Sequence, residues 1–238
     1  KWVDLTHELS PETPHWYGFK PLEGTLLFDY REGTPDDMMA PMRCIQYSVA
    51  SQYGTHVDVP LHFWGDGRDM SKITVKELVY PLVVVDKSKE CAENAEFTMT
   101  VADLEKWESE NGRIPEGAFV AFRSDWHKKS NLDNPDESGN PHYPGWSVDA
   151  IKWLVEERNI GAIGHEPADT DPSYVTTRED AYPYPGEQYI LETDRIQIEV
   201  MRNLDQVPAV GAMIVCAFPK LKDGTGFPAR CFAICPED

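Results

Sequence analysis

Residues 52–62 read QYGTHVDVPLH, and this stretch carries the clearest structural and chemical pattern in the chain. The side chains able to bind a metal fall at even positions, namely Gln52, His56, Asp58 and His62. In an extended backbone, alternate side chains share one face. The odd positions would then face a core, and they are Tyr53, Val57, Val59 and Leu61. The pattern predicts an extended segment with one polar face and one buried face.

Two residues within this segment indicate what surrounds it. Gly54 leaves a gap on the polar face, where a ligand or another backbone can approach. Pro60 cannot donate to a sheet ladder, so we expect an edge strand or an extended loop. Two imidazoles and a carboxylate on one face would suit a divalent metal. The alternative is a surface strand with scattered polar residues, but two of the seven histidines within seven residues favour a metal site.

The composition predicts a folded protein that does not bind nucleic acid or an anionic membrane surface. Hydrophobic residues make up 41% of the 238, which is enough for a packed core. The formal net charge of −19 would repel nucleic acid and an anionic membrane face. No apolar run reaches the roughly 18 residues of a membrane span. We therefore expect neither nucleic acid nor a membrane as a partner.

Cysteine usage indicates the compartment. The five cysteines are widely spread, at Cys44, Cys91, Cys216, Cys231 and Cys235. They fit small buried side chains in a reducing environment, so we expect a cytoplasmic protein. The chain begins at Lys1 and shows no signal peptide, although a leader segment removed before Lys1 is possible.

Strands outnumber helices in the predicted order, which indicates a mixed, strand-rich α/β fold. Apolar runs and alternating patterns predict strands over residues 44–50, 82–86, 118–123, 161–164, 195–200, 210–218 and 229–234. Capping residues and apolar stripes predict helices over 100–111 and 147–158. The long polar loop over 128–146 is of a kind that is often functional. No domain boundary is evident, so we expect residues 1–238 to form a single domain.

The segment over 52–62 resembles the signature His-x-Gly-Thr-His-x-Asp-x-Pro-x-His of the cyclase-like metal-dependent hydrolases, the family of bacterial kynurenine formamidase and isatin hydrolase. Six positions match: Gly54, Thr55, His56, Asp58, Pro60 and His62. Weaker resemblances follow in the family's order at residues 4–6, 122–126, 163–164, 196–204 and 226–230. The resemblance implies a single domain of the swivelling β/β/α type.

The resemblance also implies roles for site residues. His56 and Asp58 would bind metal, and Asp58 could bridge to a second ion. Glu199 would be a ligand of that second ion. His62 would be the acid/base catalyst.

Three positions depart from the family pattern. Gln52 stands where a histidine ligand is expected, and Glu187 stands where the family has a later histidine. His165 precedes Glu166 where relatives carry an uncharged residue followed by Asp. His165 would either restore a missing nitrogen ligand or be an ordinary loop histidine. Oxygen ligands favour harder ions such as Mn²⁺ or Mg²⁺, so we expect one or two divalent ions, Mn²⁺ or Zn²⁺, with a preference for Mn²⁺.

The resemblance implies hydrolysis of a C–N bond in a small aromatic or cyclic amide, through a metal-activated water with His62 as acid/base. Trp16, Phe63 and Trp64 could stack on such a substrate, or they could be ordinary core or interface aromatics. The alternatives are a metal- or ligand-binding protein that has lost catalysis, and a metal-dependent lyase or dehydratase. Relatives form oligomers, so the expected state is a homodimer or homotetramer.

Overall fold

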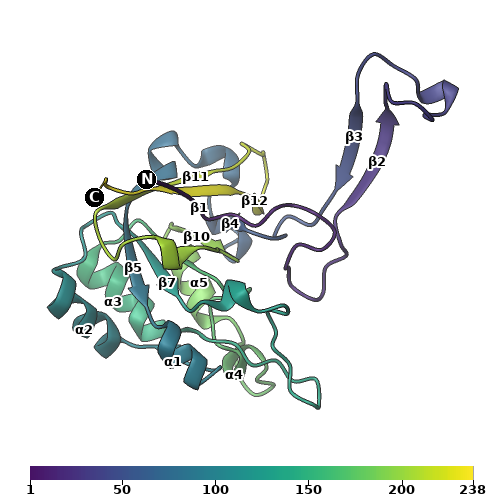
Figure 1. Cartoon of the computed structure of the whole chain (residues 1–238). Coiled ribbons are helices and arrows are strands. Elements are labelled where there is room, and N and C mark those ends of the chain that lie inside the picture. The colour runs from purple at the N-terminus through teal and green to yellow at the C-terminus, as the bar shows by residue number, and fades with distance from the viewer. Residues whose placement is uncertain (238) are drawn as a thin grey trace.

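A computed structural model describes residues 1–237, and a single curled sheet of nine strands dominates it (Figure 1). Across the sheet the strands run in the order β1 (Trp2–Asp4), β13 (Arg230–Ile234), β11 (Ala212–Ala217), β5 (Val79–Asp86), β7 (Phe119–Arg123), β9 (Ala162–His165), β10 (Ile196–Glu199), β4 (His56–Asp58) and β12 (Gly226–Pro228). The neighbours from β5 to β10 are parallel, and the remaining pairs are antiparallel. The predicted mixed, strand-rich α/β fold is therefore confirmed.

Helices cover the parallel part of the sheet. Parallel neighbours need crossover connections, which are usually helical. The helices are α1 (Ser88–Glu93), α2 (Val101–Asn111), α3 (Val148–Arg158), α4 (Ser173–Thr176) and α5 (Pro185–Glu192). Short 3₁₀ helices form at η1 (Asp36–Met38), η2 (Pro60–His62), η3 (Met70–Lys72), η4 (Val75–Leu78), η5 (Trp126–Lys128) and η6 (Leu204–Gln206). Figure 1 shows α2, α3 and α5 gathered on one side of the central strands.

Two apolar cores lie on the two faces of the central strands. On β5, Leu82 and Val84 enter a core formed within the curl of the sheet. The alternate residues Val83 and Val85 enter a second core with helices α2, α3 and α5. A strand covered on both faces reads as a continuous apolar run, which explains the three consecutive valines.

Capping side chains fix where the two predicted helices begin. Thr100 and Asp103 form a capping box at α2, and the Ser147 hydroxyl accepts a hydrogen bond from the Ala150 amide at α3. Asn159 ends α3 in a left-handed conformation with a φ of 47°. Such caps satisfy backbone groups that the helix ends leave unpaired. Both helix predictions are confirmed to within one residue of their start.

All seven predicted strands are present, but the expectation for Pro60 was wrong. β4 is hydrogen-bonded to β10 on one side and to β12 on the other, so it is not an edge strand. The chain leaves the strand after Asp58 and turns into η2, where Pro60 occupies the first position. Proline suits that position because its missing amide would be unpaired there in any case.

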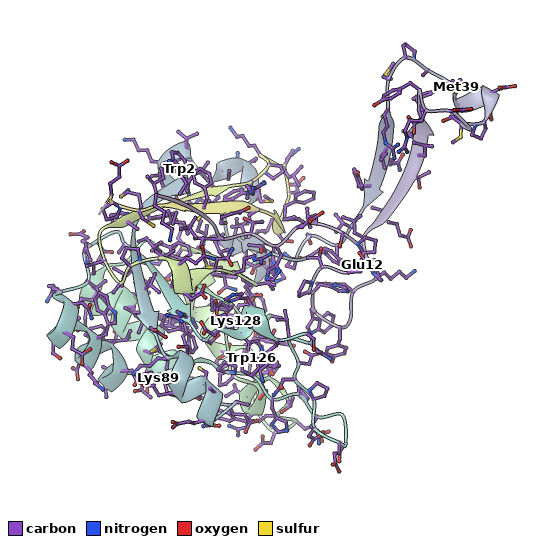
Figure 2. All side chains as sticks on the ribbon, in the orientation of Figure 1. Trp2, Glu12, Met39, Lys89, Trp126 and Lys128 are labelled. Carbon is purple, nitrogen blue, oxygen red and sulfur yellow. The ribbon has the colours of Figure 1, made fainter. Side chains whose placement is uncertain are left out.

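A two-stranded arm projects far from the rest of the molecule, with Met39 near its tip (Figures 1 and 2). Its strands are β2 (Glu23–Phe28) and β3 (Cys44–Ser48). A second small ribbon pairs β6 (Thr98–Met99) with β8 (Gly145–Trp146). Exposed large apolar side chains on the arm are Leu27, Phe28, Tyr30, Met39, Met42 and Tyr47.

The arm also corrects the prediction that the cysteines are buried, because Cys44 is exposed while the other four cysteines are buried. None of the described helices is long and apolar enough to cross a membrane.

Close packing around Gly164 supports the strand that ends at His165. An added Cβ at Gly164 would lie 2.4 Å from Phe119 Cζ and 2.6 Å from Met201 Sδ. We expect Gly164→Ala to lower the free energy of unfolding by about 1–3 kcal/mol through overpacking. Urea denaturation measures this. Gly65→Ala is the matched control, because its Cβ would meet nothing within 4 Å. Equal stabilities of the two variants would contradict the prediction.

Candidate metal centre

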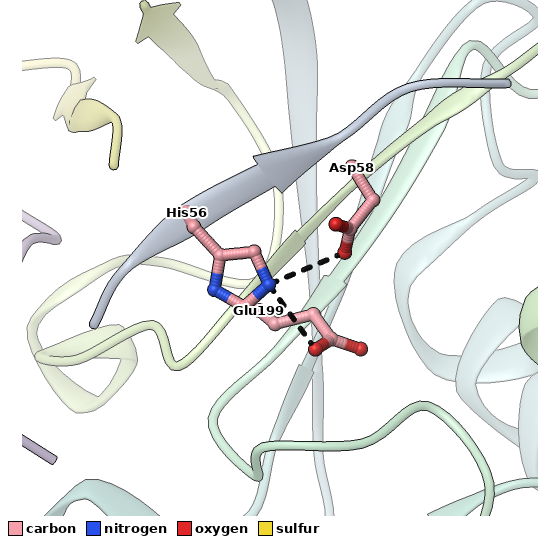
Figure 3. Close-up of side chains that lie close together, drawn as sticks. All are labelled: His56, Asp58 and Glu199. Carbon is pink, nitrogen blue, oxygen red and sulfur yellow. Dashed lines mark ion pairs between the residues drawn. The ribbon is translucent and has the colours of Figure 1, made fainter. Parts of the chain in front are cut away.

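The first group of metal-binding side chains forms where β4 pairs with β10. In this antiparallel register His56 faces Glu199, and Asp58 faces Gln197. His56 Nε2 lies 3.3 Å from Asp58 Oδ2 and 3.4 Å from Glu199 Oε2. Figure 3 draws these two ion pairs as dashed lines. All three side chains are buried, and their ligand atoms lie within 4.8 Å of one another. The strand pairing therefore creates a histidine and two carboxylates around one point.

A second group shares Asp58 with the first. His62 Nε2 lies 3.8 Å from Asp58 Oδ1 and 3.8 Å from Glu187 Oε1. The η2 turn returns His62 toward Asp58, and Glu187 projects from the first turn of α5. Asp171 accepts hydrogen bonds from the amides of Gly186 and Glu187 and so fixes the start of that helix. Asp58 thus stands between two potential cation positions.

Unpaired buried atoms in the first group match the donors that a cation requires. The Nδ1–H of His56 donates to the Gly54 carbonyl at 2.8 Å, so Nε2 faces Asp58 and Glu199 and can offer its lone pair to a cation once it has lost its own proton. His56 Nε2 and Asp58 Oδ1 are buried without a hydrogen-bond partner. Buried polar atoms are normally satisfied, so such exceptions indicate a missing ligand. A histidine oriented through its other nitrogen is also the usual arrangement in metal sites. The donor set therefore fits a divalent cation.

The charges of the cluster perturb its titration. Burial opposes ionisation of Asp58, but His56, His62 and the Gln197 amide outweigh it and lower the pKa of Asp58 to about 2. Burial, and then the negative charges of Glu199 and Asp58, raise the pKa of Glu187 well above its ordinary range. In the metal-free cluster Asp58 therefore ionises readily, whereas Glu187 tends to keep its proton.

Gln197 was not identified from the sequence, although it lies at the centre of the cluster. Its Nε2 donates to Asp58 Oδ2 at 3.2 Å, Glu187 Oε1 at 3.0 Å and Glu199 Oε1 at 3.1 Å. The Thr170 hydroxyl donates to Gln197 Oε1 at 2.7 Å. The missed signal was strand alternation, since Gln197 precedes Glu199 by two residues and shares its face.

Gln52 and His165 lie outside both three-residue groups. The Gln52 Nε2 donates to the Thr225 hydroxyl at 3.3 Å, and its side-chain oxygen accepts from Ser51. His165 Nε2 lies 3.1 Å from Glu199 Oε1, and its Nδ1 is buried without a partner. His165 ends β9 and is buried, so it is not an ordinary loop histidine.

Glu166 points to a turn beside the site. Its Oε2 accepts from the backbone amides of Ser124 and Trp126, and its Oε1 lies 2.7 Å from His127 Nδ1. Trp126 and Lys128, at the start and end of η5, are marked in Figure 2. Glu166 therefore holds this turn against β9, and it belongs to neither metal group.

A cavity of about 220 Å³ opens onto the cluster. It is lined by Trp16, Phe19, Gln52, His56, His62, Phe63, Ala168, Asp169, Tyr184, Glu187, Glu199 and Val200. Of the three aromatic residues for which substrate stacking or ordinary packing was expected, Trp16 and Phe63 line this cavity, whereas Trp64 is exposed and not among the lining residues. A larger hollow of about 820 Å³ near the N-terminal strand is lined by none of the metal-group residues.

Backbone strain accompanies the cavity at Val200. This buried residue follows Glu199 and has a φ of 52°, which is unusual for a β-branched side chain. Such a conformation costs on the order of 1–3 kcal/mol. Its amide donates to the Pro167 carbonyl, and its carbonyl accepts from the Thr55 hydroxyl at 2.6 Å. Thr55 precedes the ligand candidate His56, and Pro167 lies two residues before the cavity-lining Asp169. These two hydrogen bonds therefore keep the strained conformation of Val200 in place at the end of the strand that contains Glu199.

Comparison with known proteins agrees with this geometry. The Cyclase family model matches residues 3–172, which is well over half of the chain. The chain belongs to the Cyclase family. The match includes the 52–62 segment with both residues that β4 contributes to the cluster.

Named relatives of this Cyclase family member include hydrolases. Isatin hydrolase of Roseibium aggregatum is 32% identical over 254 residues, covering 99% of this chain and 92% of that protein. The structure of isatin hydrolase A from Labrenzia aggregata bound to benzyl benzoate superposes with a TM-score of 0.88 at 34% identity, covering 100% of this chain and 94% of the other. A kynurenine formamidase from Bacillus cereus is 23% identical over 172 residues, covering 72% of this chain and 71% of that protein.

The buried acids predict how metal-free protein responds to pH. Burial and the charge of Glu199 raise the pKa of Asp169 to about 7, and burial raises that of Asp171 to about 6. In the unfolded chain both lose their protons near 3.8. The folded state therefore binds more protons between about pH 4 and 7, and stability falls as pH rises through this window.

Burial lowers the pKa of His7 to about 4, which opposes part of this fall below about pH 6.5, so we expect the melting temperature of metal-free protein to fall by about 5 °C between pH 5 and 8. Added Mn²⁺ should reduce this fall, because the cation offsets the negative charge that opposes ionisation. Differential scanning calorimetry on protein dialysed against chelator, with and without added metal, measures both profiles. A metal-free profile that rises or stays flat over this range would contradict the prediction.

Proposed function

We propose that this chain is a metal-dependent hydrolase that cleaves the C–N bond of a small aromatic or cyclic amide. The observation that carries the proposal is the position of Asp58. It belongs to both groups of metal-binding side chains, its Oδ1 is buried without a partner, and the cluster borders an aromatic-walled cavity. Relatives named isatin hydrolase and kynurenine formamidase support the same reaction class.

The proposed ligand roles follow the two groups. His56, Asp58 and Glu199 would hold one ion, and Asp58 with Glu187 would supply oxygen ligands for a second. His165 would act through its contact with Glu199. The prevalence of carboxylate oxygen supports Mn²⁺ over Zn²⁺. Gln52 remains a candidate ligand in the same proposal, on the ground that it lines the cavity.

A divalent cation bound there would lower the pKa of a coordinated water to about 7 and polarise a carbonyl. The residues of the chain would supply the remaining steps. The His62 side chain is 29% exposed and lines the cavity, so it can accept a proton there and return it to the leaving nitrogen. Trp16, Phe63 and Tyr184 would pack against a flat substrate and exclude water.

A substrate panel tests the reaction class. Protein loaded with Mn²⁺ or Zn²⁺ is assayed against isatins, formanilides, lactams and lactones, and metal content is measured in parallel. Hydrolysis of a C–N substrate that is lost on chelation and restored by metal supports the proposal. Ligand binding without turnover would favour the binding protein, and an elimination product would favour the lyase or dehydratase.

His62→Ala separates catalysis from metal binding. General acid–base catalysis contributes about 10²–10⁴-fold, so we expect kcat to fall by that factor while the ion held by His56, Asp58 and Glu199 stays bound. His142→Ala is the matched control, because His142 pairs with Glu96 and does not line the cavity. Steady-state kinetics with metal analysis reads out both variants. Unchanged turnover in His62→Ala would remove His62 from the acid/base role.

We also propose a homodimer or homotetramer built through the arm. A two-stranded ribbon is marginally stable alone, and this one exposes several large apolar side chains. A second copy would cover them. We expect the double variant Phe28→Ser, Tyr47→Ser to shift the mass measured by light scattering toward the monomer. Val75→Ser, at an exposed apolar residue outside the arm, is the control. A monomeric wild-type protein would refute the proposal.

A further inference from the structure

Asp169 is a cavity-lining carboxylate that belongs to neither group of metal-binding side chains. The Tyr143 hydroxyl donates to its Oδ2 at 2.5 Å. Among the hydrogen bonds of residues 1–237, none involves Asp169 Oδ1. One oxygen of this side chain is therefore fixed by the protein, while the other is available to a molecule in the cavity.

The anchor of Asp169 is itself rigid. Tyr143 is buried, and its hydroxyl also lies 2.6 Å from the Thr176 hydroxyl. The Tyr143 amide donates to the Ser173 hydroxyl at 3.1 Å, which ties the 128–146 loop to the start of α4. The long polar loop thus contributes to the site through one side chain. Asp169 is held in place before any ligand arrives.

Outside the metal groups, the other side-chain acceptors of the cavity are the Gln52 oxygen, which already accepts from Ser51, and the Tyr184 hydroxyl. Its walls include the aromatic rings of Trp16, Phe19, Phe63 and Tyr184. The remaining acids, Glu187 and Glu199, lie in the two metal groups. An N–H group that loses its water without gaining an acceptor is costly. A flat amide entering this cavity therefore needs an acceptor, and Asp169 is placed to be that acceptor.

We propose that Asp169 determines specificity by accepting a hydrogen bond from the N–H of the ligand's amide or lactam group. The site would then select secondary amides and N–H lactams over N-alkylated amides, esters and lactones. The inference rests on the proposed function for the reaction that follows binding, but recognition of the N–H group is a separate property.

The chemistry of the carboxylate gives this selection its strength. Hydrogen bonds to an ionised acceptor are about twice as strong as those between neutral groups. Sites built to pair with a substrate N–H or O–H discriminate strongly against analogues that lack it, because the protein group is then left unpaired. An N-methyl group would place an apolar surface against Asp169 and exclude its water. Both effects disfavour the alkylated analogue.

Equilibrium binding tests the inference without turnover. Isatin and N-methylisatin are titrated calorimetrically into metal-free protein at pH 8, above the pKa of about 7 that burial and the charge of Glu199 give Asp169. We expect the wild type to bind isatin at least tenfold more tightly. In Asp169→Leu the ratio should approach one, through loss of affinity for isatin alone. Retained affinity for N-methylisatin also shows that the variant is folded.

Two further variants complete the test. Tyr143→Phe removes the anchoring hydroxyl and should lower the ratio partly, whereas Asp149→Leu, at an exposed position on α3, should leave it unchanged. Equal affinities of the wild type for the two ligands, including no measurable binding of either, would overturn the inference. An equal loss of both affinities in Asp169→Leu would do so too, because that result marks a structural role.

Turnover separates this inference from the proposed function. With metal-loaded protein, the ratio of kcat/KM for isatin over N-methylisatin should also collapse in Asp169→Leu. If the wild type discriminates between the ligands in binding but hydrolyses neither, nor any other amide of the panel, the proposed function fails while N–H recognition stands. If amides are hydrolysed without any discrimination, the proposed function stands and the role of Asp169 is refuted.

Discussion

Buried negative charge around Asp58 is the constraint on which the rest of the site depends. Asp58, Glu187 and Glu199 are all buried, and within residues 1–237 no lysine or arginine forms an ion pair with them. Their ion-pair partners are histidines, which carry charge only when protonated. Carboxylates removed from water need a compensating cation or must keep their protons. A divalent ion would compensate this negative charge, and the unpaired atoms His56 Nε2 and Asp58 Oδ1 belong to the groups that would bind it.

The sheet supplies the geometry that this charge requires. Antiparallel pairing of β4 with β10 fixes two residues of each strand on one face, and the first turn of α5 adds Glu187. The contacts of Gln197 Nε2 with Asp58, Glu187 and Glu199 hold these acids together, and the backbone is strained at Val200, directly after Glu199. The free energy gained by packing the two cores therefore offsets the cost of the strained and charged site, as is common for functional centres.

The cluster also gives physical meaning to the departures from the family signature. Glu187 enters the second group, where a histidine would have supplied a neutral nitrogen. Gln52 instead contacts Ser51 and Thr225. The donor set is thus richer in charged oxygen than the signature implies, which favours hard cations. Asp169 adds a further acid beside the aromatic walls, so the cavity combines a flat apolar surface with one free acceptor.

The sequence alone determined seven strands, two helices and the motif, because strand alternation, apolar runs and helix caps are local properties. It predicted β4 with His56 and Asp58, the strands β5 and β7, and the caps at Thr100 and Ser147. Only the tertiary structure placed Gln197 at the centre of the cluster, brought Glu187 beside His62 and left Asp169 with a free oxygen. These contacts join residues from separate strands, helices and loops. Their proximity depends on strand order and register, which no local pattern specifies.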